Sequence, residues 1–268
     1  MNAYEAIKEL ELSGQPVCIH SSLGSFGCRV EGLLETFLDA GCTVLVPTFS
    51  DMFEAMPVPE YMPPQNGAGD YSYFYEKEYA DVGIYNPGRN EYSREDMGAF
   101  PGLVLARPDR VRGGNHLNSF AAVGLLAREL AACQTNGDVY APLKKLYELN
   151  GFVLLMGTGL DTATAIHYAE EKAERYPFVR WSKDGSGKTI PVRAGGCSEG
   201  FPKLDAVLAP YEKQAQVEKS LWRSYRIRDL VDTAEKAFRE NPLVTHCGDS
   251  DCARCNDAAK GGPKYEKN

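Results

Sequence analysis

The sequence of 268 residues contains no apolar run of about 18 residues, so we expect no helix long enough to span a membrane. Its first residues lack the apolar stretch and the small-residue cleavage pattern of a secretory signal. Basic residues are also too few to favour nucleic acid as a partner, since 29 Lys and Arg stand against 37 Asp and Glu, for a net charge of −8. We therefore expect a soluble, cytoplasmic protein with neither a membrane nor a nucleic-acid partner.

Histidine is scarce as well, which leaves few candidates for an acid–base catalyst with a pKa near neutrality: His20, His116, His167 and His246. His167 falls in a predicted helix over residues 163–175, and Glu170 follows it at a spacing that puts both on one side of that helix. A catalytic imidazole oriented by a carboxylate would give this pattern, and so would an ion pair on a solvated helix face. The spacing alone favours the ion pair.

Negative charge is concentrated in one segment. Residues 51–100 hold ten acidic residues against three basic ones, and so carry −7 of the net −8. Eight aromatic residues lie between Phe53 and Tyr85. An acidic surface lined with rings suits a polycationic small molecule, through charge attraction and cation–π contact. A solvated loop with its rings packed on the core would have the same composition.

Apolar runs and helical periodicity alternate along the chain, which indicates an α/β layered domain. We predict buried strands at residues 17–20, 43–49 and 152–156, and helices at 30–40, at 119–132 with Ser119 at its start, and at 163–175. Strands at 178–181 and 189–193 form a predicted hairpin around Asp184, which argues against a phosphate loop at Gly185–Thr189. Two helical stretches follow, up to residue 240. A single domain is expected over residues 1–245, with a substrate-facing insertion at about 53–100 and a Cys-rich tail at 246–268.

Small residues follow the first predicted strand, in the segment Ser21–Gly27. Such residues let backbone amides approach an anion, and the start of the next helix adds positive potential, so the segment would suit a pyrophosphate. A plain tight turn with a Ser cap explains the same residues equally well.

The tail brings four potential zinc ligands into ten residues: His246, Cys247, Cys252 and Cys255. A cytosolic chain is not expected to hold structural disulfides, and the other cysteines are scattered along the sequence. Zinc and reduced cysteines, or a redox pair, remain equal alternatives.

Five segments, taken in order, resemble those of the aminoglycoside 3-N-acetyltransferase family, the antibiotic N-acetyltransferases that are unrelated to the GNAT enzymes. They are His20–Gly27, Pro47–Ser50, Asp96–Gly98, His116 with Ser119–Gly124, and Thr164–Glu170. The resemblance extends from about Val17 to Leu208. It implies a three-layer αβα sandwich around a mixed β-sheet, and acetyl-CoA-dependent acetylation of an antibiotic amine, the 3-amino group of deoxystreptamine in the best-known members.

The resemblance also implies roles for individual residues. His167 would be the catalytic imidazole, Glu170 would orient it or meet the acceptor, and Glu199 would supply a further acid. Asp161 would meet the acceptor, a cationic small molecule, and we expect the acidic segment to contact it through Asp96, Tyr73 and Glu76. Coenzyme contacts would come from two segments: Ser21, Ser22, Leu23, Ser25, Phe26, Gly27, Ser119 and Phe120.

The expected mechanism is direct transfer, in which His167 removes a proton from the attacking amine and no acyl-enzyme forms. The sequence departs from the family pattern at two places. Gly113–Leu117 stands where the family has Arg-Ser-x-His-Pro, and Tyr92–Asp96 stands where it has Thr-Pro-Ser before Met-Gly. Two alternatives stay open: acetylation of a different amine metabolite, and a non-catalytic protein assembled through zinc in its tail. A homodimer is a further option.

Overall fold

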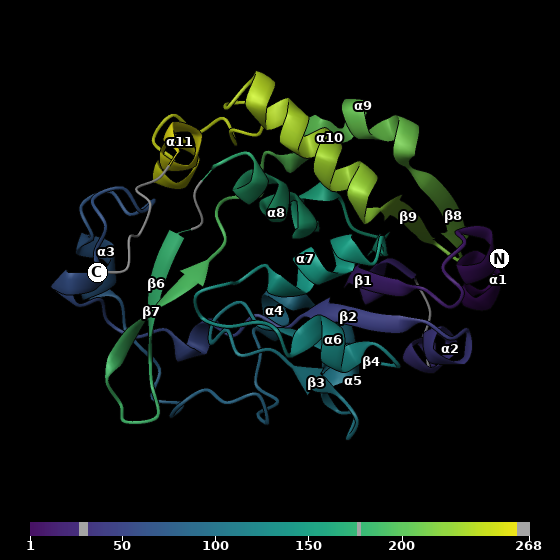
Figure 1. Ribbon diagram of the computed structural model, residues 1–268, viewed down its shortest axis with the longest axis horizontal. Coiled ribbons are helices and arrows are strands. Elements are labelled where there is room, and N and C mark those ends of the chain that lie inside the picture. Colours follow the sequence, from purple (N-terminus) through teal and green to yellow (C-terminus); the bar gives the residue numbers. More distant parts are fainter. Residues whose placement is uncertain (27–31, 176–177, 262–268) are drawn as a thin grey trace.

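The computed structural model describes residues 1–26, 32–175 and 178–261. A seven-stranded sheet in the order β3-β4-β2-β1-β5-β9-β8 runs through this part of the chain (Figure 1). Its strands are β1 (Pro16–Ser21), β2 (Thr43–Pro47), β3 (Val111–Arg112), β4 (Phe120–Val123), β5 (Phe152–Met156), β8 (Lys213–Val217) and β9 (Ser220–Arg226). β1 pairs in parallel with β2 and β5, and the outer pairs are antiparallel, so the sheet is mixed.

The three central strands are mostly apolar and almost entirely buried because helices cover both faces of the sheet. Alternate residues point to opposite faces, so that Leu45 and Val153 join one core while Val44 and Leu154 join the other. The first core packs against α6 (Ala127–Ala131), α7 (Ala141–Glu148), α8 (Ala165–Lys172) and α10 (Ile227–Glu240). The second packs against α1 (Ala3–Glu9), α2 (Leu33–Asp39) and α5 (Phe100–Leu105).

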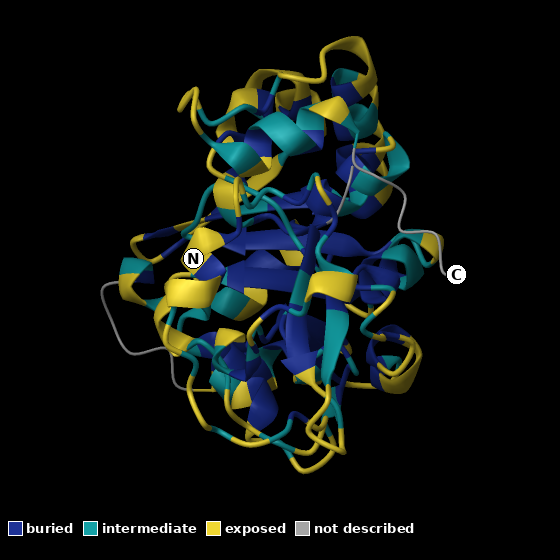
Figure 2. Ribbon diagram, turned by 90° about the vertical axis from the view of Figure 1, so that its left-hand side faces the viewer, coloured by how far each residue is buried: buried dark blue, intermediate teal, exposed yellow. Residues whose placement is uncertain are grey.

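The strands accordingly lie in the buried interior, and the helices around them expose their outer sides (Figure 2). This arrangement confirms the predicted three-layer αβα sandwich around a mixed sheet. The predicted strands at 17–20, 43–49 and 152–156 are β1, β2 and β5. The helix predicted over 30–40 is α2, and Gly41, with a left-handed φ of +79°, follows its end.

A separate two-stranded hairpin, β6 (Phe178–Lys183) and β7 (Thr189–Ala194), stands beside the main sheet, near α3 (Ser72–Glu76) and α11 (Ala253–Lys260) (Figure 1). The Asp184 N–H donates to the Lys188 carbonyl at 2.9 Å and closes the turn, which confirms the predicted hairpin. Short helical turns complete the chain: α4 (Arg94–Met97), α9 (Asp205–Leu208), η1 (Leu23–Phe26), η2 (Asp51–Phe53), η3 (Pro59–Tyr61), η4 (Leu160–Thr162), η5 (Phe201–Leu204) and η6 (Ala209–Tyr211).

The helix predicted over 119–132 is wrong in its first part. The segment 119–132 begins as strand β4 and only then becomes α6, with Gly124 between them at a φ of +115°. A Cβ at this glycine would lie 2.9 Å from the Cys42 carbonyl oxygen, so the strand leaves the sheet where only glycine fits. Between the hairpin β6–β7 and residue 240, where two helical stretches are predicted, the chain forms the short turns η5, α9 and η6, then the hairpin β8–β9, and then helix α10. The buried residues of β8–β9 alternate with exposed ones at its start.

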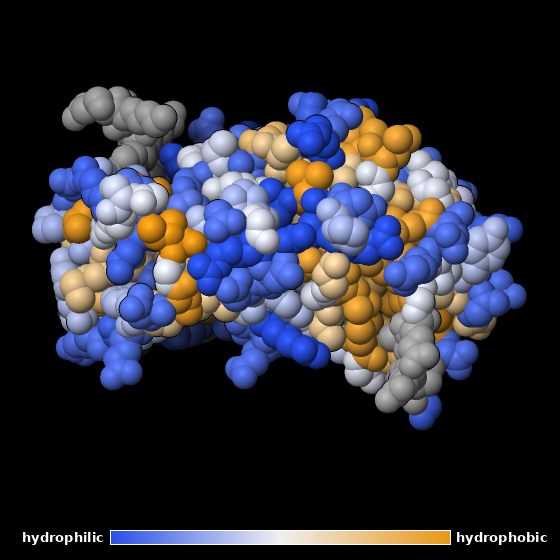
Figure 3. Space-filling model, turned by 90° about the horizontal axis from the view of Figure 1, so that it is seen from below, coloured by the Kyte–Doolittle hydropathy of each residue, from blue (hydrophilic) through white to orange (hydrophobic). Residues whose placement is uncertain are grey.

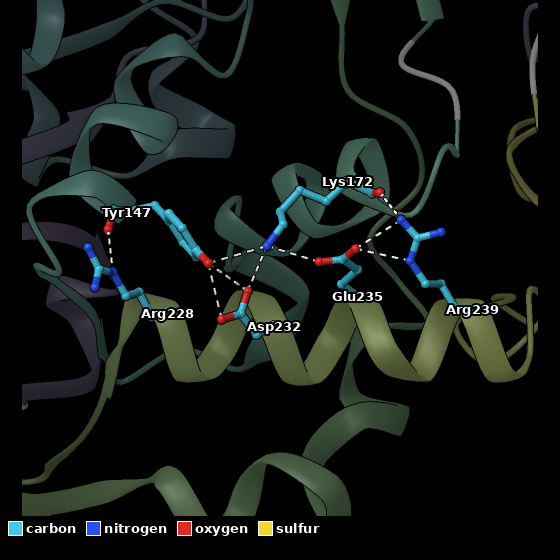
Figure 4. Close-up of polar contacts among 6 residues, drawn as sticks. All are labelled: Tyr147, Lys172, Arg228, Asp232, Glu235 and Arg239. Carbon is cyan, nitrogen blue, oxygen red and sulfur yellow. Dashed lines mark hydrogen bonds and ion pairs between the residues drawn. The ribbon is translucent and has the colours of Figure 1, made fainter.

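A charged network joins α8 to α10 on the outer side of the first core (Figure 4). Lys172 at the end of α8 places its Nζ 2.6 Å from Asp232 Oδ1 and 2.9 Å from Glu235 Oε2. Arg239 contacts Glu235 at 2.9 Å and donates to the Lys172 carbonyl, and the Tyr147 hydroxyl donates to Asp232 at 2.9 Å. Because each of these charges has more than one partner, the network fixes α8 against α10 more firmly than an isolated surface pair would.

Apolar side chains also reach the surface. On the face seen from below, they gather over the half that contains the main sheet, whereas polar side chains cover most of the other half (Figure 3). The large apolar residues that are most exposed include Leu125 and Leu243. Within the described residues, no helix is both long enough and apolar enough to cross a membrane.

Candidate active site

A cavity of about 1060 Å³ opens where the parallel strands end. Ser21 at the end of β1, Pro47 at the end of β2 and Thr158 after β5 all line it. Ligands of open α/β sheets bind beyond the carboxyl ends of their strands, and the three parallel strands of this sheet end together there. The hairpin β6–β7 and the segment around α3 and α4 supply further walls.

His167 lines this cavity from α8. Its Nδ1 lies 2.6 Å from Glu170 Oε2, one helical turn further on, and both side chains are about nine-tenths buried. The ring of Phe201 meets the imidazole edge-on at 4.8 Å between centroids, and Tyr140 stacks parallel to it at 6.1 Å. When the carboxylate accepts a hydrogen bond from Nδ1–H, the proton of the neutral ring is on Nδ1 and Nε2 keeps its lone pair. A general base requires this form.

The partner of Glu170 on its other side is Arg175. Arg175 Nε lies 3.2 Å from Glu170 Oε1, in an ion pair without hydrogen-bond alignment, and the guanidinium stacks on the Phe238 ring at 4.8 Å. The solvated ion pair that spacing favoured is therefore wrong for Glu170, which faces inward. Its neighbour Glu171 does pair at the surface, with Lys144 Nζ at 2.7 Å.

Five acidic residues line the cavity: Asp51, Glu54, Glu95, Asp96 and Asp161. Four of them come from the acidic segment 51–100. Lys77 neutralises part of this charge through a short ion pair with Glu54. The side chain of Asp51 is exposed to the cavity, yet the surrounding protein and then the charges of Glu54 and Asp96 raise its pKa to about 6. Burial is the larger cause and the two neighbouring carboxylates add to it, so a bound cation would stabilise the ionised form of Asp51.

The predicted acceptor residues are divided by the structure. Asp161, Asp96 and Tyr73 line the cavity with His167, whereas Glu76 lies on the exposed surface outside its lining. Glu199 is exposed as well, although the neighbouring Ser198 lines the cavity. Neither of these two glutamates lines the cavity beside the imidazole.

The predicted coenzyme loop meets the cavity at its first residues. Ser21, Ser22 and Leu23 line the cavity, while Ser25 and Phe26 turn inward. The Ser25 hydroxyl lies 2.7 Å from the Ser22 carbonyl and 2.9 Å from Ser220 Oγ, and Phe26 packs against Trp222 at 6.1 Å between ring centroids. Ser25 and Phe26 thus hold the turn. Gly27 lies outside the described residues.

The second predicted coenzyme segment, Ser119 and Phe120, is buried beneath the cavity. Ser119 is not a helix cap, since its hydroxyl donates to the Thr48 carbonyl at 2.9 Å and accepts from Arg112 Nε at 3.0 Å. Phe120 is fully buried in the first core. Neither residue is part of the lining, so any effect on a ligand would pass through Arg112 and Thr48.

The other histidines have different surroundings. His20 lies at the floor of the cavity, where burial lowers its pKa to about 4, so it is neutral at physiological pH. His116 is 3.1 Å from Ser182 Oγ through Nδ1, and burial lowers its pKa. His246 Nε2 lies 3.0 Å from Asn256 Oδ1.

Four cysteine sulfurs lie within 4.8 Å of one another and could hold a metal ion: Cys197, Cys247, Cys252 and Cys255. Three of them belong to the set predicted from the tail. The fourth predicted ligand, His246, is not part of this cluster, because its Nδ1 accepts the Gly248 N–H at 3.1 Å and its other nitrogen faces an amide. Cys197 takes its place, although no local pattern distinguishes it from the other scattered cysteines.

Other residues of the site also escaped the sequence analysis. Asp51 and Glu54 lie in the acidic segment, whose composition pointed to them as a group but not individually. Tyr140 and Phe201, which pack against the imidazole, carry no local signal: Tyr140 is the residue before α7, and Phe201 is the first residue of the short turn η5. Arg175 could have been found only by testing which basic residue follows Glu170 just beyond the end of α8.

Comparisons with known proteins agree with this fold. The family model described as aminoglycoside 3-N-acetyltransferase matches residues 18–239. Aminoglycoside N(3)-acetyltransferase VIII of Streptomyces fradiae is 29% identical over 194 residues, which make up 69% of this chain and 62% of that protein. The chain therefore spans about three fifths of the length of this curated relative.

Two solved structures share the fold. A variant of aminoglycoside acetyltransferase AAC(3)-IVa in complex with a gentamicin superposes with a TM-score of 0.73 at 24% identity, covering 97% of each chain. AAC-IIIb in a binary complex with CoASH gives a TM-score of 0.67 at 21% identity, covering 89% of this chain and 95% of the other. Because the family model extends over most of the sequence and these folds coincide, the chain belongs to the aminoglycoside 3-N-acetyltransferase family.

Proposed function

We propose that this protein is an acetyl-CoA-dependent N-acetyltransferase that acetylates the 3-amino group of a deoxystreptamine aminoglycoside. The observation that carries the proposal is a buried imidazole, His167, held by Glu170 at the edge of a cavity with five acidic residues in its walls. An aminoglycoside bears several ammonium groups, so a negative cavity attracts it and a base beside that cavity can deprotonate it. Relatives with the same fold bind a gentamicin and CoASH.

His167 acts as the general base. Its Nε2 takes a proton from the acceptor amine while the amine nitrogen attacks the acetyl carbonyl carbon. The new N–C bond forms, the thioester C–S bond breaks, and the proton on Nε2 passes to the sulfur of the leaving CoA. Glu170, which also pairs with Arg175, stabilises the imidazolium that exists between these two proton transfers. Positioned bases of this kind contribute about 10²–10⁴-fold to a rate.

Direct transfer is favoured over an acyl-enzyme. A covalent route needs a nucleophile activated by a hydrogen bond to the base. Across residues 1–26, 32–175 and 178–261, no serine or cysteine side chain is hydrogen bonded to His167, whose one polar side-chain partner there is Glu170. No cysteine of these ranges lines the cavity either.

The acidic walls select and orient the acceptor. Asp161 lies close to α8 along the chain, in η4, while Asp51 and Asp96 come from the acidic segment. We assign the ammonium groups that do not react to these carboxylates, so that the 3-amino group is left for His167. Tyr73 adds an exposed ring at the cavity wall, where it can stack on a cation.

The coenzyme would enter along the turn after β1. Ser21, Ser22 and Leu23 face the cavity, and Met97 and Gly98 line it beside them. Gly98 has a φ of +74°, and a Cβ there would lie 3.2 Å from the Ser21 carbonyl oxygen, so a glycine lets the two segments approach closely. These two segments together form a cavity wall along which an extended chain such as pantetheine could lie.

The test is release of CoA, read with a thiol reagent, from acetyl-CoA in the presence of gentamicin, sisomicin or apramycin. Reactions without enzyme and with His167→Ala serve as controls. Release that requires both the antibiotic and His167 would establish the proposal. If no antibiotic of the panel causes CoA release, the acceptor is not an aminoglycoside. A melting temperature that still rises with acetyl-CoA would then point to another amine as the acceptor. A melting temperature that does not rise would overturn the proposal of acetyl transfer itself.

A further inference from the structure

We propose that Cys197, Cys247, Cys252 and Cys255 bind one zinc ion as a tetrahedral tetrathiolate, and that this ion fastens helix α11 to the wall of the cavity. The metal site stands on the geometry of the cysteines alone. Its effect on the acceptor rests on the proposed acetyltransferase function.

The distances fit zinc. The four sulfurs lie within 4.8 Å of one another, and four sulfurs at about 2.3 Å from a tetrahedral zinc lie about 3.8 Å apart. The site would therefore close by small movements, as the thiols give up their protons on binding the metal. An all-sulfur set selects a soft ion such as zinc over calcium or magnesium, which prefer oxygen ligands.

Packing on both sides of the cluster keeps the ligands together. The Cys247 N–H lies 3.4 Å from Cys255 Sγ, as is usual for an amide that stabilises a thiolate ligand, and Cys255 is buried. Next to Cys197, a Cβ at Gly200 would come 2.0 Å from the Thr245 carbonyl oxygen, so these two segments touch backbone to backbone. Lys203 Nζ donates to the His246 carbonyl at 2.6 Å and joins them again.

The cluster connects two walls of the cavity. On one side, Gly195, Gly196 and Ser198 line the cavity next to Cys197. On the other, Arg254 lies between two of the ligands and also lines it. The metal would thus fix the position of one wall relative to the other.

Helix α11 also holds part of the acidic segment. Asp257 Oδ2 accepts the Gly67 N–H at 2.8 Å, and Gln65 Nε2 donates to the Asp257 carbonyl at 3.0 Å. Gly67 and Ala68 line the cavity. Loss of the metal would therefore loosen the acceptor side of the cavity, whereas the turn after β1 would keep its position.

Metal analysis of the full chain, purified under reducing conditions without added chelator, tests the site directly. We expect about one zinc per chain. Cys197→Ser should lose most of it, whereas Cys133→Ser, at an exposed cysteine outside the cluster, and His246→Ala should keep it. The proposal would be overturned if the wild-type protein contained no zinc. It would also be overturned if Cys197→Ser kept all of its zinc while His246→Ala lost it.

X-ray absorption on the wild-type protein covers the case in which Cys197→Ser fails to fold. Four sulfurs at about 2.3 Å around zinc would support the site, and a shell containing nitrogen would overturn it in favour of the histidine.

Removal of the zinc should then raise the acceptor KM about fivefold, the effect of about one lost hydrogen bond, with the acetyl-CoA KM unchanged. An unchanged acceptor KM would overturn the link to the cavity. Metal content is measured whether or not the protein acetylates anything, so the two proposals fail separately.

Discussion

Replacing Glu170 by Gln tests the proposed catalytic pair more sharply than removing the imidazole. The substitution keeps the size and shape of the side chain and removes its charge. Glu170 Oε2 lies 2.6 Å from His167 Nδ1, with both side chains about nine-tenths buried, so solvent does not replace the lost interaction. The Gln side-chain oxygen can still accept a hydrogen bond from Nδ1–H, and the neutral imidazole therefore keeps its orientation.

The expected loss follows from the charge that develops on His167 during the reaction. Hydrogen bonds to charged groups are worth about 1.5–3 kcal/mol, against about 0.5–1.5 kcal/mol for neutral ones. The imidazolium thus loses about 1.25 kcal/mol of stabilisation relative to the neutral ring, which lowers kcat about eightfold. Arg175 also loses its buried partner while keeping the Pro242 carbonyl, so unfolding becomes easier by up to about 3 kcal/mol.

Steady-state kinetics at a temperature well below the melting point separates these two effects, with circular dichroism to show that the variant is folded. Glu171→Gln is the matched control, because the neighbouring carboxylate on the same helix pairs with Lys144 at the surface. Its kcat should change less than about twofold. If folded Glu170→Gln keeps more than a third of the wild-type kcat while His167→Ala is inactive, the carboxylate does not assist the base and our reasoning is wrong.

Three further outcomes follow from the same site. His167→Ala should lower turnover by about 100-fold or more while acetyl-CoA still raises the melting temperature, and near-normal turnover would exclude this residue as the base. The KM for a cationic acceptor should rise with salt between about 0.05 and 0.5 M, since ions screen the acidic walls; a flat response would remove their steering role. Because the pKa of Asp51 is raised to about 6, its carboxylate ionises as the pH rises through that value. The acceptor KM should therefore fall between about pH 5 and 7, and Asp51→Asn should abolish that fall; a variant with the wild-type pH profile would assign the effect to another group.

The parts of the fold that sequence predicts well are those whose local pattern permits one structure. The runs at 17–20, 43–49 and 152–156 are β-branched or leucine-rich and too short for helices, and all three are central strands. The prediction of one helix over 119–132 is wrong because Phe120–Val123 contains two alanines and is followed by a true helix. No proline separates the two, so helical spacing continues through the strand. Its pairing with β2, which makes it a strand, is a contact across more than 70 residues.

The site shows the same division. His167 and Glu170 are three residues apart, so the spacing placed them together, but whether they face solvent or core depends on Phe201 and Tyr140 from distant segments. Cys197 lies 50 positions before Cys247, and a search for local metal motifs does not reach that far. His246 was assigned instead because it is adjacent in sequence, although its ring is hydrogen bonded elsewhere.

Most of the acidic residues of the cavity lie in loops, whereas the proposed catalytic pair lies on a packed helix. Four of the five acids come from residues 51–96, a segment of loops and single turns, while His167 lies on a helix fixed by the core and by the Lys172 network. Surface loops accept substitutions and insertions far more readily than packed helices. Substitutions in residues 51–96 can therefore change, one at a time, which acceptor binds, while the proposed catalytic pair stays in place. The acceptor range of such variants would diverge long before their shared reaction did.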